Sequence, residues 1–474
     1  MTVIRPKIKI LNKEYKEKIL KEAKEILETQ GIFIENQEAI ELFQKKGLKQ
    51  INSRVFIPAD LIDRCLRTVP EEIKLYDREG ETPLVLSGER VHYDPGSAAI
   101  LILDDSTGKT RNAESRDFIR FSKITGHLKY IDAQSTALIY QDIPKNAQDW
   151  HRLYLALSYC PKPVITGTFR KESFSIMQEL LLACRTSEKS LAEKPLAIFD
   201  ACPSPPLKWS DLTTQSVIDA AKSMIPSEFV SMPLAGASAP ITLLGSITQH
   251  CAESLAGMVI AQLTRNGAPI IWGGSPAILD MKTGTTPMGA IETMMINLGD
   301  VEMGKFLKIP THAYMSLSDS KVPDSQAGFE AGMGALLAGL AGINMISGPG
   351  MLDFESTQSI EKLIIDNEIC GMVKRFLRGI NDYGTPFASE ILKDYDEKQE
   401  LLSHPSTLKL FREELFFPSS VIDRTTRDSW KALGSKSARN RAKEIALKLE
   451  KKAALKPIAQ DLTKELKRIT TNYL

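Results

Sequence analysis

The chain has 474 residues, of which 43% are hydrophobic and 25% are charged, and its 60 basic and 59 acidic side chains almost cancel. This balance gives no overall field that would hold nucleic acid or an anionic membrane, so neither is an expected partner. The first residues lack the apolar segment of a secretory signal, which predicts a cytoplasmic protein. The six cysteines are scattered, without Cys-x-x-Cys or zinc-like pairing with histidine, so no metal site is predicted.

Residues 1–90 have the pattern of a helical segment. Apolar side chains in residues 19–27 recur on one helical face, and Gly31 follows as a C-terminal cap. A second helix is expected to begin after Asn36 and a third after Pro58. We expect these helices to have a structural role.

Residues 91–376 alternate short apolar runs with longer helical stretches, which is typical of a parallel sheet covered by helices. Neither a G-x-G-x-x-G motif after an early strand nor a P-loop motif occurs, so no nucleotide-binding fold is indicated. Eight runs favour an α/β fold of the (β/α)8 TIM-barrel type. The expected strands are 91–94 (with 100–103 as the alternative), 130–139, 163–168, 195–201, 228–234, 269–272, 311–316 and 343–347.

Residues 331–352 carry no charge, a length that could suggest a membrane span. Glycines and Pro349 interrupt this run, so it fits better a buried helix followed by a short buried strand. The small residues of the helix, within 327–342, would let it pack closely against the barrel.

Residues 377–474 return to amphipathic helices, and the part from 431 to 468 is rich in Lys and Arg. The simplest interpretation is a helical extension with a solvated basic face. A docking surface for an acidic partner is the alternative.

Aromatic side chains stand at or near most of the expected strand ends, although they make up 7% of the chain. In a barrel the active site lies at the C-terminal ends of the strands. A ring of aromatic faces is what a quaternary ammonium group requires, although each aromatic alone also fits core packing. The predicted cage consists of Trp272, Tyr314, Tyr93, Tyr140 and Phe199.

The loop after the seventh strand is polar, and its predicted catalytic groups are Asp319, Asp324 and Gln326. Asp324 could instead cap the following helix. Lys321 could form a Schiff base in a lyase or aldolase, but two flanking carboxylates make it an unusual lysine for that chemistry.

Among the histidines, His312 lies in a strand beside Tyr314 and is a candidate for the pocket, whereas His151 and His250 fit structural roles in helices. Phe354 and Glu355 follow the last strand, and we expect them to close the mouth of the barrel.

Several segments resemble the trimethylamine methyltransferase family: IPADLIDRCLRTVP, SDSKVPDSQAGFEAG, LDFESTQSIEKLIIDNEICGMVKR, HPSTLKLFREELFFPSSVIDR and DSWKALGSKSARNRA. The methylamine enzymes of that family are distinguished by a genetically encoded pyrrolysine. This sequence contains standard residues alone, so it resembles the non-pyrrolysine branch. Characterised members of that branch demethylate quaternary amines such as glycine betaine, proline betaine and carnitine.

The resemblance implies methyl transfer from a quaternary amine to the Co(I) of a corrinoid, a cobalamin-type cofactor. Charge cancels as the reduced cobalt attacks the cation, so a dry, aligned cavity would favour the step without a general acid. The base-off corrinoid motif Asp-x-His-x-x-Gly is not matched, because DWHRLY from Asp149 has Tyr154 at the Gly position. The corrinoid is therefore expected on a separate small corrinoid protein.

If the substrate is a betaine, its carboxylate needs hydrogen-bond donors such as His312, Gln134 or Lys321. The resemblance also leads us to expect a homo-oligomer. Two alternatives remain open from the sequence: the barrel lyase or aldolase using Lys321, and a non-catalytic betaine-binding protein.

Overall fold

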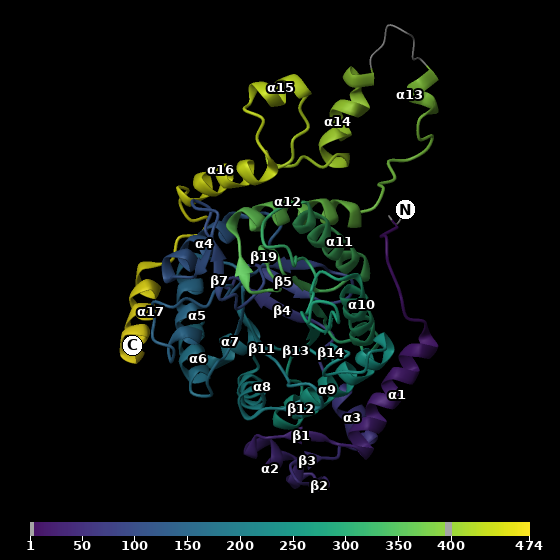
Figure 1. The fold of residues 1–474 in the computed structure, drawn as a ribbon, viewed down its shortest axis with the longest axis vertical. Helices are drawn as coiled ribbons and strands as arrows, with labels where there is room; N and C mark the ends of the chain where they lie inside the picture. Colours follow the sequence, from purple (N-terminus) through teal and green to yellow (C-terminus); the bar gives the residue numbers. More distant parts are fainter. Residues whose placement is uncertain (1–3, 394–400) are drawn as a thin grey trace.

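The computed structural model describes residues 4–393 and 401–474 and has mixed α/β architecture (Figure 1). Two parallel sheets lie at its centre, with strand orders β15-β13-β11-β10-β9 and β17-β18-β6. Each of these strands overlaps one of the eight expected runs, and the first is the 91–94 run rather than 100–103. Their bounds are β6 (His92–Asp94), β9 (Gln134–Ser135), β10 (Val164–Gly167), β11 (Ala197–Ala201), β13 (Ser227–Ser231), β15 (Ile270–Gly274), β17 (His312–Tyr314) and β18 (Met345–Ser347).

Backbone contacts link the two sheets at both pairs of edges. A parallel bridge between Trp272 and Thr311 joins β15 to β17. At the other side, the N–H of Ala133 donates to the carbonyl of Tyr93 in β6 at 3.2 Å. The eight strands therefore follow one another in a circular order, with their carboxyl ends on the same side.

Helices between the strands cover the outer face of the sheets. The small residues of α11 have the expected effect: a Cβ added to Gly334 would lie 1.6 Å from the carbonyl oxygen of Met315, so α11 approaches the strands closely. The covering helices are α4 (Ser115–His127), α5 (Gln148–Tyr159), α6 (Ser173–Ala183), α7 (Glu188–Glu193), α8 (Asp211–Ser223), α9 (Leu243–Thr264), α10 (Ile291–Phe306), α11 (Ser325–Ala341) and α12 (Ile360–Leu377).

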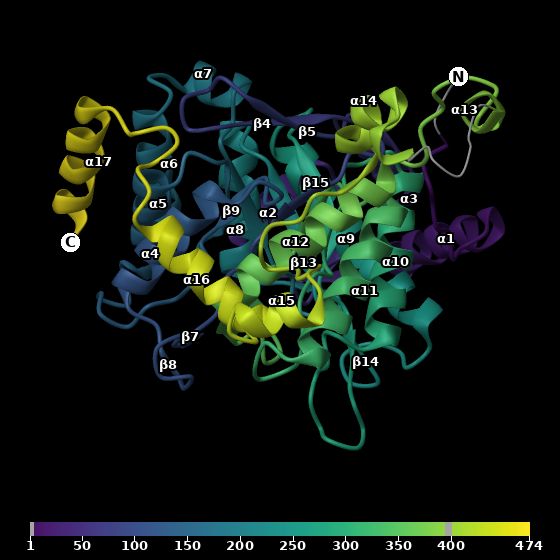
Figure 2. The same ribbon diagram turned by 90° about the horizontal axis from the view of Figure 1, so that it is seen from above.

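A hairpin of β4 (Ile73–Tyr76) and β5 (Pro83–Leu86) closes the end of the strands opposite their carboxyl ends. Its apolar side chains pack with Ile165, Ile198 and Ile271 from the central strands. Figure 2 shows this hairpin on the opposite side from β7, β8 and β14. These and the other short strands around the carboxyl ends are β7 (Leu101–Leu103), β8 (Thr110–Asn112), β14 (Leu234–Ala235), β16 (Ala277–Ile278), β19 (Met351–Leu352) and β20 (Thr357–Gln358).

The N-terminal segment contains the three expected helices, α1 (Lys13–Thr29), α2 (Gln37–Lys45) and α3 (Ala59–Leu66). It is not purely helical, because it also contains β4, β5 and the short strands β1 (Ile32–Ile34), β2 (Gln50–Ile51) and β3 (Arg54–Val55). β1 pairs with β12 (Lys208–Trp209). This pairing could not be predicted from the N-terminal residues alone, because β12 lies far along the sequence.

The C-terminal extension is helical, as expected. Figure 1 shows α13, α14 and α15 projecting from the body, while α16 lies along α12 and α17 lies beside α5 and α6. No helix within the two described ranges has the length and apolarity needed to cross a bilayer. The elements are α13 (Ser389–Lys393), a 3-10 turn at Leu401–Ser403, α14 (Pro405–Glu414), α15 (Arg427–Ala432), α16 (Ala438–Glu450) and α17 (Gln460–Tyr473).

Candidate active site

Alternation along the strands places aromatic and acidic neighbours on opposite faces of the sheets. The hydroxyl of Tyr93 donates to the carbonyl of Ala335 in α11 at 3.2 Å, so this ring faces the helices. The next residue, Asp94, faces the interior of the ring of strands and bonds to Ser347 of the neighbouring strand.

The same alternation holds one strand pair further along. Phe199 packs against Phe174 of α6, with ring centroids 4.8 Å apart. Its neighbour Asp200 is the register partner of Glu228 on the adjacent strand. The interior therefore carries acidic side chains at the level where the predicted aromatics point outward.

Four buried side chains in the interior form a continuous line of contacts across β6, β18, β17 and β13. The hydroxyl of Ser347 donates to Asp94 Oδ1 at 2.6 Å and lies 2.9 Å from His312 Nε2. His312 Nδ1 lies 2.9 Å from Glu228 Oε1. We call these four residues the interior chain.

Asp200 stands beside the Glu228 end of the interior chain and is partly exposed. Burial raises the pKa of both Asp94 and Asp200 well above the ordinary value, and the neighbouring Glu228 carboxyl raises each pKa further. The guanidinium of Arg152 opposes this effect at Asp200, and burial lowers the pKa of Arg152 itself to about 10. Within the described ranges, no three His, Cys, Asp or Glu side chains are arranged to hold a metal ion.

Tyr314 lies next to the interior chain, toward the carboxyl ends of the strands. Its ring meets the His312 ring edge-on, with centroids 5.1 Å apart, and its side chain is almost fully buried. Burial is the largest cause of a pKa well above the ordinary tyrosine value, and surrounding negative charge adds to it. That charge comes from four carboxyl groups: Asp200, Glu355, Asp94 and Glu228.

Glu355 reaches this site from a loop whose backbone is unusual. Asp353, Phe354 and Glu355 have φ of 52°, 53° and 67°, three consecutive left-handed residues without a glycine. Such a conformation is costly and persists where the surroundings impose it, often at functional sites. The Ser275 hydroxyl donates to Glu355 at 3.3 Å, and burial, together with the nearby Asp319, raises the pKa of Glu355 to about 7.

The polar loop residues and Phe354 line a cavity of about 630 Å³ beside this loop. Asp319 accepts hydrogen bonds from two backbone N–H groups at 2.9 and 2.8 Å, yet burial raises its pKa to about 6. Lys321 Nζ stands 3.8 Å from the centroid of the Phe354 ring and 3.3 Å from Asp353. The structure thus places Asp319, Lys321, Gln326 and Phe354 around one cavity.

Two of these loop residues have other partners. Asp324 caps α11, where its Oδ1 accepts from the N–H of Ala327 at 3.0 Å, and this bond lowers the pKa of Asp324. The exposed amide of Gln326 donates to Glu330 at 2.9 Å. The capping interpretation of Asp324 is therefore confirmed. This cap does not place its carboxyl among the interior residues, so it gives no support to the predicted catalytic role.

Three further predicted site residues face the helices rather than the interior. The indole N–H of Trp272 donates to the carbonyl of Asp300 at 3.0 Å. The hydroxyl of Tyr140 lies 2.6 Å from His151 Nδ1. The Gln134 amide donates to three carbonyls at the end of α5 and just beyond it. Of the five predicted cage aromatics, Tyr314 is the one that meets the interior chain.

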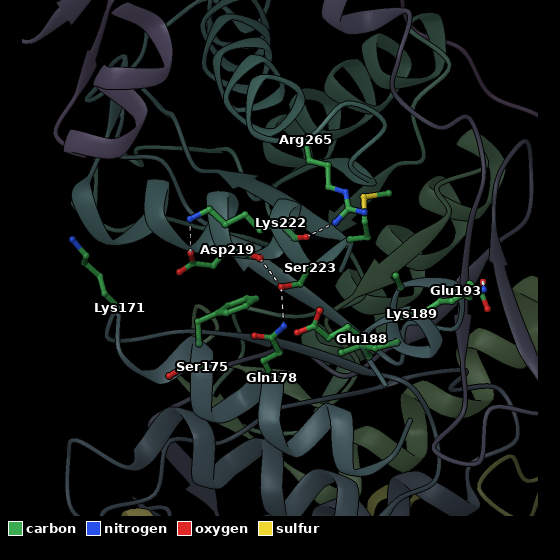
Figure 3. A pocket seen from close by; sticks show the side chains of 14 residues that line it. Lys171, Ser175, Gln178, Glu188, Lys189, Glu193, Asp219, Lys222, Ser223 and Arg265 are labelled. Carbon is green, nitrogen blue, oxygen red and sulfur yellow. Dashed lines mark hydrogen bonds and ion pairs between the residues drawn. The ribbon is translucent and has the colours of Figure 1, made fainter. Parts of the chain in front are cut away.

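A larger hollow of about 830 Å³ lies on the outside, between α6, α7 and α8 (Figure 3). Several of its polar groups already bond one another, such as Gln178 with Ser223 at 3.1 Å and Asp219 with Lys222 at 3.8 Å. Its lining includes none of the residues that meet at the strand ends. The acidic interior, rather than the larger hollow, combines perturbed titratable groups with convergent strand ends.

A family model described as trimethylamine methyltransferase (MTTB) matches residues 1–471. The chain belongs to this family. A trimethylamine methyltransferase of Desulfitobacterium hafniense is 30% identical over 447 residues, covering 94% of this chain and 90% of the relative. A glycine betaine methyltransferase of another strain of that species is 27% identical over 427 residues, covering 90% and 89%. The chain is a methyltransferase, and its standard residues place it with the non-pyrrolysine branch.

A solved structure with a related architecture is the monomethylamine methyltransferase of Methanosarcina barkeri. Its TM-score to this chain is 0.55 at 11% identity, covering 94% of this chain and 89% of the other. At that identity the likeness concerns the fold alone, and it agrees with the mixed α/β order of strands described above.

Proposed function

We propose that the chain moves a methyl group from a quaternary amine to the Co(I) of a corrinoid carried by a partner protein. In this proposal the two parallel sheets form one (β/α)8 barrel, and the interior chain with Tyr314 is the substrate site at its mouth. Glycine betaine, proline betaine and carnitine are the substrates to test first.

The observation that carries the proposal is the surroundings of Tyr314. One buried aromatic ring is flanked by four carboxyl groups and by His312, at the carboxyl ends of the strands. A trimethylammonium group has a spread positive charge and no N–H, so aromatic faces and nearby negative charge hold it better than directed hydrogen bonds do. One relative reported above is named for trimethylamine, a tertiary amine, and another for glycine betaine, a quaternary amine, so both are named for methylated amines.

The chemical step needs alignment rather than a proton donor. The bond between nitrogen and one methyl carbon breaks, and the amine keeps that electron pair. Cobalt(I) supplies the pair for the new carbon–cobalt bond and becomes formally Co(III). The enzyme's part is to hold the cation with one methyl toward the mouth and to exclude water.

The corrinoid is a second substrate here, and it requires a protein that docks over the mouth. Exposed apolar side chains near this end support such a surface: Met232, Ile241, Met281, Ile291 and Val322 are 40%, 62%, 68%, 47% and 38% exposed. Grouped exposed apolar side chains are typical of interaction sites. Docking on the basic residues of 431–468, and a homo-oligomeric state, stay predictions.

The lyase or aldolase alternative gains no support from Lys321. Its side chain is 59% exposed, pairs with Asp353 and donates to the carbonyl of Asp319 at 2.7 Å. A Schiff-base lysine usually needs a desolvated environment that lowers its pKa, and this one is hydrated and ion-paired.

The test is anaerobic absorbance of cob(I)alamin mixed with the protein and, in turn, glycine betaine, proline betaine, carnitine, γ-butyrobetaine, choline and trimethylamine. We expect one quaternary amine to remove the Co(I) band, in the wild type and in Tyr314→Phe, which keeps the aromatic face. Tyr314→Leu should lose most of the rate, whereas Tyr140→Phe, in the helical layer, should keep it. A response to trimethylamine alone, or to no compound even with a corrinoid protein, would overturn the proposal.

A further inference from the structure

The contacts within the interior chain determine how many protons it must hold. Three contacts join its four members: Asp94 to Ser347, Ser347 to His312, and His312 to Glu228. Each contact needs one proton between its two atoms. A hydroxyl and a neutral imidazole supply two protons, so the third must sit on a carboxyl group or on the imidazole.

The contact between His312 and Glu228 must hold one of the three protons. His312 Nδ1 and Glu228 Oε1 lie 2.9 Å apart but are not well aligned, and neither has another hydrogen-bond partner among the described residues. Both side chains are completely buried. Two facing lone pairs at such depth would be costly, so a proton lies between these two atoms. If it is the Nδ1–H of His312, the contact between Ser347 and His312 is the one that needs the third proton.

We propose that the interior chain carries one net negative charge, which it can hold at either end, and that this charge balances the fixed cation of the substrate. This inference rests on the proposed function. Two carboxylates and one added proton give the single charge. If Glu228 holds the proton, Glu228 donates to His312, His312 to Ser347, and Ser347 to an ionised Asp94.

The opposite arrangement needs no exchange of protons with solvent. Asp94 then donates to Ser347, Ser347 to His312 Nε2, and His312 Nδ1–H to an ionised Glu228. Each of three protons moves along its own contact, and the negative charge moves from one end of the chain to the other. Burial raises the pKa of Asp94, which favours keeping the added proton within the interior chain.

Other titratable groups face the interior chain. Asp132 lies near Asp94, and Asp200 with its partner Arg152 lies near Glu228. The remaining neighbours are Tyr314, and, toward the mouth, Cys202 and Glu355. Asp200 is the neighbour that could supply a replacement charge if the interior chain lost its own, because it stands next to Glu228 on the adjacent strand.

The proposed interior chain predicts an unusual pattern of binding affinities in variants whose carboxyl groups are replaced by amides. In Glu228→Gln the amide donates to His312 and Asp94 keeps the charge, and in Asp94→Asn the charge stays on Glu228. Each single variant keeps one charge in the interior chain, so its loss of affinity for tetramethylammonium should be small compared with that of the double variant. The double variant has no charge in the chain, so its loss should exceed the product of the two single losses, or its binding should release a proton from Asp200.

Isothermal titration with tetramethylammonium, in two buffers of different ionisation enthalpy, measures both affinity and proton release. The matched control is Asp300→Asn, a buried carboxyl 3.5 Å from His250 in the helical layer, which should leave both unchanged. If the fold-losses in affinity of the two single variants simply multiply in the double variant, and no proton is released on binding, the inference is overturned. If no form of the protein binds any quaternary amine, the proposed function fails instead.

If the double variant does not fold, Glu228→Gln with and without Ser347→Ala tests the same connection. Glu228→Gln alone leaves the charge on Asp94, where the hydroxyl of Ser347 stabilises it; without that hydroxyl the buried carboxyl of Asp94 keeps its proton. Glu228→Gln with Ser347→Ala should therefore bind tetramethylammonium more weakly than Glu228→Gln, or release a proton on binding. Equal affinity of the two proteins without proton release would refute the connection through Ser347.

Discussion

Replacing Glu355 with glutamine tests whether the mouth carboxyl is as perturbed as its surroundings imply. Burial raises the pKa of Glu355 to about 7 from 4.5, so its neutral form is favoured in the folded protein. This contribution to stability is fully present below the unfolded pKa of 4.5 and is lost as the pH rises through 7. Full ionisation would cost about 3 kcal/mol, and because Glu355 is partly exposed we expect about 2 kcal/mol between about pH 5.5 and pH 8.5.

Glu355→Gln keeps the shape and removes the titration, so its free energy of unfolding should fall less with pH than that of wild type. For a chain of 474 residues, about 2 kcal/mol corresponds to roughly 2 °C in Tm. Urea unfolding and Tm at several pH values measure the difference, with the exposed Glu292→Gln as control. Parallel pH profiles for wild type and Glu355→Gln would refute the reasoning. The same ionisation should tighten binding of tetramethylammonium by about threefold to tenfold in wild type and not in the variant.

Four further substitutions separate packing from function. Gly334→Ala should destabilise by about 3 kcal/mol or more, because its Cβ meets the Met315 carbonyl, whereas Gly332→Ala, with open space around it, should stabilise by up to about 1 kcal/mol in urea unfolding. Trp272→Phe should lower Tm through loss of its buried hydrogen bond, about 1 to 3 kcal/mol, and leave the Kd for tetramethylammonium unchanged; a large rise in Kd would restore Trp272 to the cage. Asp324→Ala should cost about 1 kcal/mol as a lost cap and keep the rate of methyl transfer; a rate lowered a hundredfold would restore its predicted catalytic role.

Most of the central strands could be predicted from the sequence because they are short apolar runs separated by helical stretches. All eight expected runs contain a strand, since a parallel strand buried on both faces reads as continuous apolar sequence. The short strands of residues 32–55 were missed. Two of them have two residues each, and the third, β1, also pairs with β12, which lies far along the chain.

The site was harder to predict, because strand ends show which residues are near the mouth but not which face they occupy. The aromatics at positions 93, 199 and 272 were chosen as cage residues, and all three face the helices. Their neighbours Asp94 and Asp200, one residue further along, face the interior. Counting alternation from an apolar inward residue such as Ile198 would have found Asp200, because inward positions recur every two residues.

The pKa values of the acidic groups rise with their depth below the mouth. The pKa is raised to about 6 at Asp319 and to about 7 at Glu355, and well above the ordinary value at the fully buried Asp94. Desolvation grows along this line, so near neutral pH Asp319 is mostly ionised and the interior retains protons. An entering cation therefore meets ionised carboxylates first, which attract it from solvent. A fixed cation brings no proton of its own, so the countercharge at the base of the site must already exist there, and the interior chain can supply it without exchanging a proton with solvent.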